Sequence, residues 1–328
     1  MTEILKAHGS QNDIFIAART PADFASDADL RAFVRALCDR SGPLGGDGIY
    51  FYDAADVAPR AWFFNPDGSS AEFCGNGMRC LGRVILDLRG QDSAVIKSGE
   101  TEAALTDYKV SRGPATPEGV HQITLEHPEV SFNPEVLAGA APLIEAAIPE
   151  LDPSLAFTAV TIPNPHLVAT VKDYDEASLI AMGETIASRH DLFPAGANLS
   201  VLLPVTGTEV FVRTFERGAG LTASCGSGMA AARSVYSRIS AVDPAEPVII
   251  HNAGGVATVS LWDCRPVLTG NATYVYRAEI DFTAPLPPAV PRQDLTAETR
   301  AYSALEYQNE KWLATYDIVT AHIPTPQP

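Results

Sequence analysis

One motif occurs twice in this chain, as Cys74-Gly75-Asn76-Gly77-Met78 and as Cys225-Gly226-Ser227-Gly228-Met229, with the two cysteines 151 positions apart. Each copy precedes a run with helical character, residues 79–88 and 230–239. Each of these runs is followed by two strand-like segments around a glycine turn. In sequence order these segments are 94–97 and 103–105 in the first copy, and 247–251 and 256–261 in the second. A motif, a helix and a hairpin that recur in one order predict two homologous halves.

The chemistry of the motif follows from its place at the start of a helix. The first backbone N–H groups of a helix have no partner within it, and the helix dipole adds partial positive charge there. Glycine lets an anion approach this backbone closely, so the motif can bind a carboxylate. The same field favours a thiolate over a thiol and makes such a cysteine a usable base. Two copies therefore indicate two thiols that face one substrate from opposite sides.

Composition and charge narrow the class of protein. The chain has 328 residues, of which 46% are hydrophobic and 19% are charged, and this is typical of a globular protein with two domains. A net charge of −17 argues against nucleic acid and anionic membranes as partners. We find no apolar run long enough for a signal peptide or a membrane helix, so we expect a cytoplasmic protein.

The remaining cysteines and histidines have structural interpretations. Five widely spaced cysteines in a cytosolic chain indicate free thiols, and no pair or histidine cluster has zinc spacing, so no metal is expected. Because a free cysteine is usually a buried structural residue, we interpret Cys38, Cys80 and Cys264 as core residues. Four histidines are expected in loops or at the surface: His121, His127, His190 and His251.

Further helices and strands are expected from hydrophobic periodicity. Helical spacing covers residues 30–39 and 178–189. Strand patterns cover residues 61–64, 158–171 (two strands around Pro163-Asn164-Pro165-His166), 199–205, 209–215 and 272–282.

Over roughly residues 1–283 the chain resembles the diaminopimelate epimerase family. The matching pieces are His8-Gly9-x-x-Asn12-Asp13, Gly45-Gly46-Asp47-Gly48, Asn65-x-Asp67-Gly68-Ser69, Cys74-Gly75-Asn76-Gly77-x-Arg79-Cys80, Asn164-Pro165-His166, Asn198, Glu216-Arg217-Gly218-Ala219-Gly220 and Cys225-Gly226-Ser227-Gly228. The resemblance implies interconversion of LL- and meso-diaminopimelate, a small-molecule substrate, without pyridoxal phosphate or metal. Cys74 and Cys225 would be the acid–base pair, one removing the α-proton and the other returning a proton to the opposite face.

The resemblance also implies the residues of the substrate site. The α-carboxylate would bind backbone at the two helix starts, at Gly75, Asn76, Gly226 and Ser227. The remaining substrate-binding residues would be Asn12, Asn65, Asn164, Asn198, Glu216 and Arg217. Arg217 suits the distal carboxylate of diaminopimelate by charge and by the fork geometry of its guanidinium. His166 would orient a thiol, or tune it, since a nearby imidazolium favours thiolate.

The fold that the family implies is α+β, with two pseudo-symmetric domains. Each domain would be an antiparallel sheet wrapped around a central helix, and the active site would lie in the interdomain cleft. We expect an N-terminal domain over residues 1–128, which the returning strand 270–283 joins, and a C-terminal domain over 129–269. Residues 284–328 would form a Pro-rich linker and a helical extension.

Several positions depart from the usual family pattern. Gln11 stands where glycine is commoner, Ser227 replaces threonine, and Thr269-Gly270-Asn271-Ala272 lacks the usual proline. The tail has no counterpart in the family, and its apolar residues fall on one helical face. They are Leu295, Tyr302, Leu305, Trp312, Leu313 and Tyr316. That face should dock on the catalytic domains or on a second subunit, which leaves a homodimer open.

Two rival functions remain open. The first is another cofactor-independent racemase or epimerase, acting on proline, hydroxyproline or an amino acid of secondary metabolism. The intact set of asparagines with Arg217 argues against it, whereas Gln11 and the tail leave it open. The second is a binding protein that uses the carboxylate site for recognition alone, and the presence of both cysteines argues against that.

Overall fold

The structure is a computed structural model that describes residues 2–99, 101, 105–132, 136–138, 142–162, 164–282, 293, 294 and 296–320. Several positions interpreted above lie outside the described residues. They are the strand start at 103 and 104, Pro163, the Pro-rich linker 284–291 and Leu295. Within the described chain, no helix is both long and apolar enough to span a membrane.

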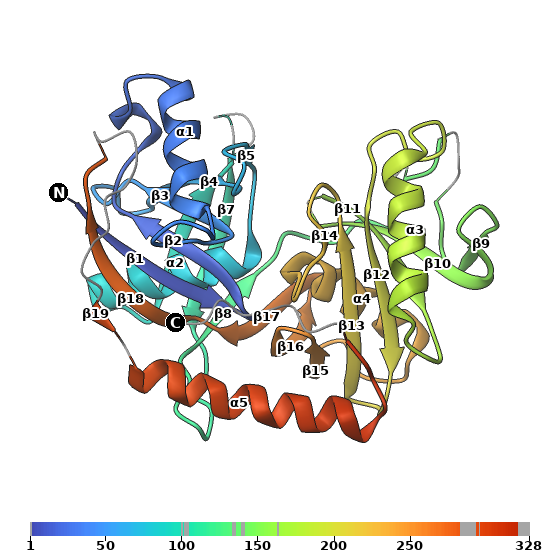
Figure 1. The fold of residues 1–328 in the computed structure, drawn as a ribbon. Helices are drawn as coiled ribbons and strands as arrows, with labels where there is room; N and C mark the ends of the chain where they lie inside the picture. The colour runs from blue at the N-terminus through green and yellow to red at the C-terminus, as the bar shows by residue number, and fades with distance from the viewer. Residues whose placement is uncertain are drawn as a thin grey trace. The chain divides into compact units, whose positions relative to one another are not determined.

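The described residues group into two compact units (Figure 1). Unit 1 lies within Met1–Leu125 and Thr269–Leu305, and unit 2 within Glu126–Leu268 and Glu306–Pro324. Both units contain the same sequence of elements: two strands, a helix, two strands, a two-residue strand, a second helix and two strands. In unit 1 these are β1 (Thr2–Gly9), β2 (Asn12–Ala17), α1 (Asp27–Cys38), β3 (Gly48–Tyr52), β4 (Arg60–Phe64), β5 (Ser70–Ala71), α2 (Gly75–Arg89), β6 (Ser93–Ser98) and β7 (Thr106–Arg112). In unit 2 they are β10 (Asp152–Ile162), β11 (Asn164–Thr170), α3 (Glu176–Ser188), β12 (Asn198–Pro204), β13 (Glu209–Glu216), β14 (Gly220–Leu221), α4 (Gly226–Ile239), β15 (Val248–Asn252) and β16 (Gly255–Trp262).

The remaining elements are outside this repeated set. They are a 3-10 turn (Pro21–Asp23), β8 (Gln122–Glu126), β9 (Ala146–Ile148), β17 (Arg265–Asn271), β18 (Thr273–Ile280), β19 (Gln293–Asp294) and α5 (Thr296–Thr315). In unit 1, β18 pairs antiparallel with β1 from Thr2 opposite Ile280 to His8 opposite Thr273. The last strand of the predicted fold thus returns to the first strand of the chain.

Strand pairing follows one scheme in both units. In unit 1, β1–β2, β3–β4 and β6–β7 are antiparallel, whereas β2–β3 and β4–β6 are parallel. In unit 2, β10–β11, β12–β13 and β15–β16 are antiparallel, whereas β11–β12 and β13–β15 are parallel. The predicted α+β class is confirmed, with sheets that are mixed rather than wholly antiparallel. Each parallel pair is joined through a helix, because parallel neighbours need a crossover connection.

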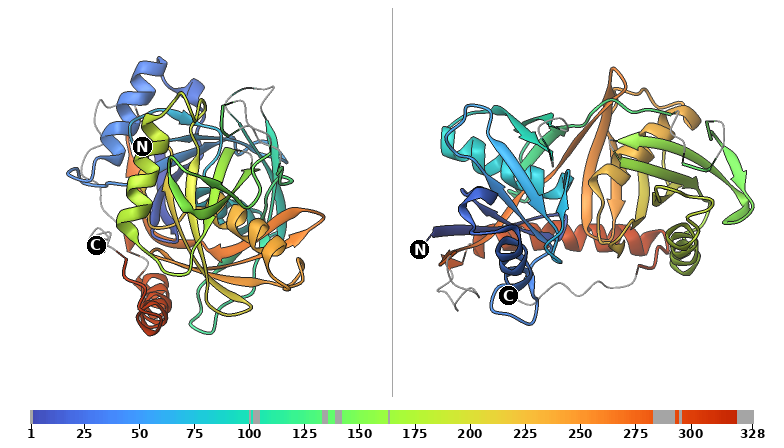
Figure 2. Two further views of the ribbon diagram at one scale, coloured as in Figure 1. Left: turned by 90° about the vertical axis from the view of Figure 1, so that its right-hand side faces the viewer. Right: turned by 90° about the horizontal axis from the view of Figure 1, so that it is seen from above.

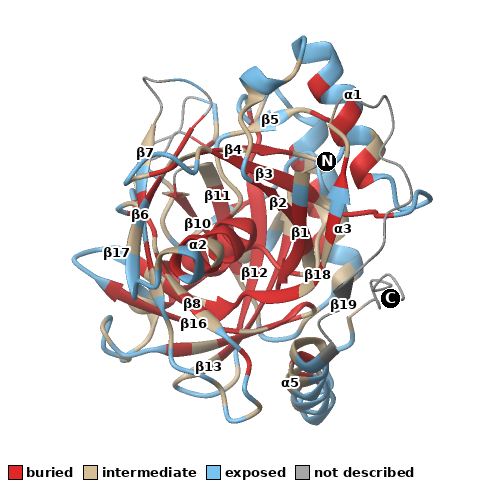
Figure 3. Cartoon of the chain, turned by 90° about the vertical axis from the view of Figure 1, so that its left-hand side faces the viewer, coloured by how far each residue is buried: buried red, intermediate tan, exposed pale blue. Residues whose placement is uncertain are grey.

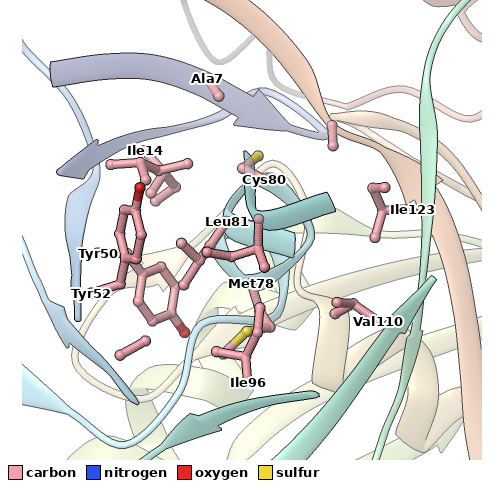
Figure 4. Close-up of a cluster of buried hydrophobic side chains, with 14 of the residues drawn as sticks. Ala7, Ile14, Tyr50, Tyr52, Met78, Cys80, Leu81, Ile96, Val110 and Ile123 are labelled. Carbon is pink, nitrogen blue, oxygen red and sulfur yellow. The ribbon is translucent and has the colours of Figure 1, made fainter. Parts of the chain in front are cut away.

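Helix α2 forms the centre of unit 1. Its neighbours in space are β1, β2, β3, β6 and β7. Met78, Cys80 and Leu81 of α2 pack with Ile14, Tyr50 and other apolar side chains of these strands (Figure 4). Most residues of the helix are buried, whereas Asp87 and Leu88 near its end are exposed (Figure 3). The surrounding strands account for this burial, since they cover the apolar side chains of the helix.

Helix α4 has the same place in unit 2 (Figure 2, orange). It lies against β10, β11, β12, β13 and β16, and the alanines Ala230–Ala232 are fully buried in its core cluster. The first helix of each unit, α1 or α3, packs through a separate apolar cluster. Leu30, Phe33 and Val34 place α1 in one of them, and Leu179 and Met182 place α3 in the other.

Three side chains differ from their predicted burial. Cys264 is exposed, because Asp263 and Cys264 form the turn between β16 and β17 with positive φ angles of 47° and 61°. His127 and His251, expected in loops or at the surface, are buried at 1% and 6% exposure. His251 is on β15, and His127 donates its backbone N–H to Pro266 O. Cys38 and Cys80 are buried, as predicted.

The second glycine of each cysteine motif has a packing role. A Cβ at Gly77 would lie 2.8 Å from Cε2 of Tyr50. A Cβ at Gly228 would lie 2.4 Å from Oγ1 of Thr214 and 3.0 Å from Oγ of Ser200. These two hydroxyl groups are hydrogen-bonded to each other at 2.9 Å, so neither can move without losing that bond. Only glycine lets the first turn of the helix approach its strands this closely.

We expect Gly228→Ala to lower the free energy of unfolding by about 1–3 kcal/mol, the usual cost of forcing an extra methyl group into a packed core. Urea denaturation followed by circular dichroism measures the change. Gly207→Ala is the matched control, because a Cβ at Gly207 has no neighbour within 4 Å. Equal unfolding midpoints for the two variants would contradict the packing role.

Candidate active site

Cys74 is the N-cap residue of α2, as the sequence predicts. Its Sγ accepts a hydrogen bond from the backbone N–H of Gly77 at 3.5 Å. The Cys74 backbone is fixed by Tyr50, whose hydroxyl accepts from Cys74 N at 3.0 Å and donates to Cys74 O at 3.3 Å. The thiol itself donates to Oδ1 of Asn12 at 3.5 Å. A half-buried thiol is thus held at the positive end of a helix dipole.

Asn12 is placed by a tight turn between β1 and β2. Ser10 and Gln11 form this two-residue turn with φ angles of 52° and 63°, the left-handed conformation of a type I′ hairpin. Glycine adopts such angles without strain, which explains why glycine suits position 11 better than glutamine does. Ser10 N donates to Oδ1 of Asn271 at 2.7 Å, and Asn271 Nδ2 donates to His8 O at 3.1 Å. Asn271 therefore holds both ends of the turn that carries Asn12.

Arg79 connects this turn to helix α2. It is fully buried, and its guanidinium donates to Asn271 O at 3.2 Å and to Ser10 Oγ at 3.3 Å. Gly9 lies so close to the helix that a Cβ there would be 2.8 Å from Asn76 O. The turn and the start of α2 are therefore one rigid assembly within unit 1.

Cys225 is the N-cap residue of α4 and repeats the geometry of Cys74. Its Sγ accepts from the backbone N–H of Gly228 at 3.4 Å and lies 3.6 Å from Ser227 Oγ. Its electrostatic environment is unfavourable to a thiolate. Burial and the nearby charge of Glu216 raise the pKa of Cys225 well above its usual value, against the opposing effects of Ser227 and Gly228. The simple expectation of a thiolate at a helix start therefore does not hold for Cys225.

Glu216 lies at the end of β13 and close to the second thiol. Its Oε1 accepts from Thr222 Oγ1 at 2.5 Å. Burial raises the pKa of Glu216, and the bond from Thr222 acts in the opposite direction. The carboxyl group is therefore a local charge that acts directly on Cys225.

A second group of predicted residues meets around His166 in unit 2. His166 Nε2 lies 3.2 Å from Asn164 Oδ1 and 3.4 Å from Asn198 Nδ2. Asn198 Oδ1 accepts from the backbone N–H of Arg217 at 2.8 Å, and Arg217 Nη1 donates to Ala195 O at 2.6 Å. Asn164 begins β11 as Asn12 begins β2, so the two asparagines have equivalent places in the two units.

The predicted role of His166 as an imidazolium does not fit its environment. The ring is fully buried, and burial, together with the nearby His127 and Arg217, lowers the pKa of His166 to about 3. The ring is therefore neutral near pH 7 and cannot stabilise a thiolate by charge. His166 can still orient a neighbouring side chain, because its Nε2 can form a hydrogen bond with Asn164 or with Asn198.

The other predicted residues lie at the ends of the same elements. Gly75, Asn76, Gly226 and Ser227 form the first turns of α2 and α4, where backbone N–H groups have no intrahelical acceptor. Asn65 lies just after β4, and its Nδ2 donates to Ser69 Oγ at 3.0 Å. In unit 1 a hydrogen bond joins Asn12 to Cys74, whereas Asn65 is bonded within its own turn.

Sequence reasoning missed three residues that support the site. Tyr50 fixes the backbone of Cys74, Asn271 holds the Asn12 turn, and Thr214 packs against Gly228. For Asn271 the signal was its departure from the family pattern. For Tyr50 and Thr214 the sequence carries no local signal, because their partners are distant in sequence.

Cys74 and Cys225 differ from the other cysteines in their place at a helix start. Cys38 and Cys80 lie within α1 and α2, and burial raises the pKa of each to about 12. Among the described residues, no group of three or more histidine, cysteine, aspartate and glutamate side chains is placed to hold a metal ion. The chemical groups that the site offers are two thiols, helix-start amides, asparagine side chains, Glu216 and Arg217.

Comparison with known proteins agrees with this geometry. The sequence profile of the diaminopimelate epimerase family matches residues 4–116 and 158–275. The diaminopimelate epimerase of Listeria monocytogenes serovar 1/2a is 32% identical, over 94% of this chain and 97% of its own length. That of Methanopyrus kandleri is 33% identical, over 84% of this chain and 88% of its own length.

Solved structures share the fold at low sequence identity. A PhzF-family phenazine biosynthesis protein from Bacillus anthracis has a TM-score of 0.60 and 17% identity, covering 84% of this chain and 97% of its own. A hydroxyproline epimerase from Agrobacterium vitis has a TM-score of 0.58 and 17% identity, covering 87% and 92%. These structures show the two-domain α+β fold, and the sequence matches show more: the chain belongs to the diaminopimelate epimerase family, isomerases that act on amino acids.

Proposed function

We propose that this protein interconverts LL- and meso-2,6-diaminopimelate by a two-base mechanism in which Cys74 and Cys225 act on one α-carbon without pyridoxal phosphate. The observation that carries the proposal is the repeated cysteine cap. Each cysteine caps the N-terminus of a largely buried helix, and each Sγ accepts a hydrogen bond from the backbone N–H of the glycine three residues later. The relatives named diaminopimelate epimerase support the choice of substrate.

The proposed step moves one proton off the substrate and another onto it. A cysteine thiolate takes the α-hydrogen as a proton and becomes a thiol, which leaves a carbanion at Cα. The opposite thiol then donates its proton to the other face of that carbon and becomes a thiolate. The two sulfurs have exchanged protonation states, so each turnover leaves the enzyme ready for the reverse reaction until protons exchange with water.

The two environments assign different resting states to the thiols. Burial and Glu216 hold the pKa of Cys225 high, which keeps it protonated and ready to donate. The Cys74 thiol donates a hydrogen bond to the neutral side chain of Asn12. We therefore assign Cys225 as the acid and Cys74 as the base of the resting enzyme. Pairs of groups whose environments push their pKa values apart are typical of acid–base sites.

The carbanion needs stabilisation, and helix-start amides can supply it. As Cα loses its proton, negative charge spreads onto the α-carboxylate. Backbone N–H groups at Gly75, Asn76, Gly226 and Ser227 are the proposed donors, since preoriented donors stabilise charge that develops in the transition state. Gly9, packed against Asn76 O, keeps the α2 donors in place.

Arg217 is the proposed ligand of the distal carboxylate. The side chain is exposed and one nitrogen, Nη1, is anchored on Ala195 O. In the described part of the chain, its other guanidinium nitrogens have no hydrogen-bond acceptor, so they can bind a carboxylate in bidentate fashion. Asn164 and Asn198 can bind the distal ammonium through their oxygens. A substrate with charged groups at both ends uses all of these residues, whereas proline does not.

The product would serve lysine and peptidoglycan precursor synthesis, as part of the same proposal. The direct test is α-proton exchange in D2O, followed by NMR with LL-diaminopimelate, meso-diaminopimelate, proline and hydroxyproline, without added pyridoxal phosphate. We expect deuterium to enter diaminopimelate alone, with approach to the LL/meso mixture. Exchange only in proline or hydroxyproline would move the substrate assignment to the rival racemases.

We expect Cys74→Ala and Cys225→Ala each to lower epimerisation by about 10²–10⁴-fold, the usual contribution of one acid or base. Polarimetry or coupled assay of LL-diaminopimelate conversion measures the loss. Cys264→Ala is the control, because this thiol is exposed on a turn and should be dispensable. Full turnover in either active-site variant would exclude the two-base mechanism.

We expect Glu216→Gln to shift the pH profile of Cys225 alkylation to lower pH by about one unit. The carboxylate charge raises the pKa of Cys225, so its removal increases the thiolate fraction at every pH below that pKa. Iodoacetamide labelling with peptide mass spectrometry measures the profile. The Cys74 profile in the same samples should stay unchanged, and a shift towards higher pH at Cys225 would contradict the assignment.

We expect Arg217→Ala to lower kcat/KM for diaminopimelate by about ten- to a hundredfold, the loss of a charged hydrogen-bonded pair. Steady-state kinetics measures the change. Arg265→Ala is the matched control, because Arg265 is exposed on β17 and its ion pair with Glu129 is 4.0 Å long. Unchanged kinetics in Arg217→Ala would remove this residue from the substrate site.

A further inference from the structure

In each unit, a pair of side chains from helix α5 contacts residues that in turn contact the cysteine helix or the turn beside it. Residues Thr296–Leu305 of this helix belong to unit 1, and residues 306–315 belong to unit 2. We infer that α5 positions the two catalytic thiols. Its first half acts on Cys74 through Glu298 and Tyr302, and its second half acts on Cys225 through Asn309 and Trp312. The inference rests on the proposed roles of the thiols.

Glu298 holds helix α2 nine residues after Cys74. Its two carboxylate oxygens accept from Arg83 Nη1 at 2.6 Å and from Nη2 at 2.8 Å. Arg83 is on α2 and only 4% exposed, and its Nη1 also donates to Ala272 O at 2.6 Å. A further bond to Glu298 Oε2 comes from Tyr274 N at 3.1 Å. A bidentate pair of this kind fixes direction as well as distance, so it sets the position of α2 against β18.

Tyr302 supports the turn that carries Asn12. Its ring lies edge-on to His8, with 4.3 Å between centroids. His8 is at the end of β1, and its carbonyl accepts from Asn271, which also holds Ser10. Beyond that turn, Asn12 accepts the hydrogen bond of the Cys74 thiol. Tyr302 thus supports Asn12, the hydrogen-bond partner of Cys74, and Glu298 supports α2, the helix that Cys74 caps.

Asn309 and Trp312 contact the corresponding region of unit 2. Asn309 is 4% exposed, its Oδ1 lies 2.8 Å from His251 Nδ1, and its Nδ2 donates to Asn252 O at 2.9 Å. Trp312 stacks on His251 with 3.5 Å between centroids and 3° between planes. Both residues of α5 therefore hold the end of β15.

The end of β15 in turn contacts the start of α4. Asn252 Nδ2 donates to Met229 Sδ at 3.2 Å, and Met229 is in the first turn of α4, four residues after Cys225. Gly254 N donates to Ala223 O at 2.9 Å, two residues before Cys225. The segment 252–254 therefore touches the chain on both sides of the second thiol.

The contacts of α5 are of a kind that fixes the position of the neighbouring elements and does not merely hold the helix on the surface. Much of α5 is exposed, including Tyr307 at 56% (Figure 3). Its apolar contact is small, with Leu313 packed against Leu203 and Phe211. The buried contacts elsewhere on the helix are directional: a bidentate ion pair, an amide bonded on both sides and two ring contacts. Directional bonds define a geometry, whereas apolar contact mainly supplies affinity.

The five cysteines of the intact chain allow a direct test that does not depend on turnover. Iodoacetamide labelling of each cysteine, as a function of pH, is measured by peptide mass spectrometry in Glu298→Ala and in Asn309→Leu. Cys264 is exposed and reports the reagent, whereas Cys38 and Cys80 are buried and report unfolding. Tyr307→Ala, an exposed position on the same helix, is the matched control.

We expect Glu298→Ala to change the labelling rate of Cys74 by about threefold or more, and to leave Cys225 unchanged. Asn309→Leu should change Cys225 by a similar factor and leave Cys74 unchanged. Tyr307→Ala should change neither thiol. The inference would be overturned if either variant changed the labelling of both thiols equally or of neither thiol. It would also be overturned if labelling of Cys38 and Cys80 rose in parallel, because the change would then reflect unfolding. Unchanged diaminopimelate turnover in variants that show this crossed labelling would instead contradict the proposed function, because the thiols would then be positioned by α5 without taking part in the reaction.

Discussion

A helix that starts inside a protein has backbone N–H groups that must find partners other than its own carbonyls. In this protein that requirement arises twice, at Gly75 and at Gly226, and the first acceptor in each case is a cysteine sulfur. Much of the surrounding structure keeps these two helix starts close to their strands. Gly77 and Gly228 allow the close approach, and strands pack around both helices.

The two helix starts share a geometry and differ in charge. Cys74 has a neutral amide, Asn12, as the partner of its thiol, whereas Cys225 lies beside the carboxyl group of Glu216. In the proposed mechanism, the same motif therefore provides the acid at Cys225 and the base at Cys74. Differentiation by surroundings rather than by residue type is the usual way for one fold to perform both kinds of proton transfer. It also explains why His166, buried and neutral, contributes orientation and no charge.

The motifs were readable from the sequence because their meaning is local. A cysteine followed by two glycines and an apolar helix specifies a cap, and helices α2 and α4 begin where this pattern predicts. Periodicity also placed α1, α3 and most strands within a few residues. The family resemblance supplied Asn12, Asn198 and Arg217, which lie in the described contacts, while their roles remain proposals. What could not be read depends on distant contacts: the parallel pairs, the burial of His251 by Trp312, and the bonds that join Asn271 to Ser10. Cys264 was misjudged because its turn, not its hydrophobicity, decides its exposure.

Asn271 has a further consequence for the order in which the protein is built. It lies 261 positions after Ser10 and 192 after Arg79, and β18, which completes the sheet beside β1, follows it directly. On the ribosome, the residues around Cys74 emerge first but must wait for almost the whole chain before their last partners arrive. The hydrogen bonds of Glu216 and of the Cys225 thiol come from residues 216–228, whereas Asn309 and Trp312 reach the end of β15 only when the chain is nearly complete. Both halves of the site thus depend on residues that are synthesised late, and a chain that stops before residue 271 would also lack the residue that fixes its N-terminal turn.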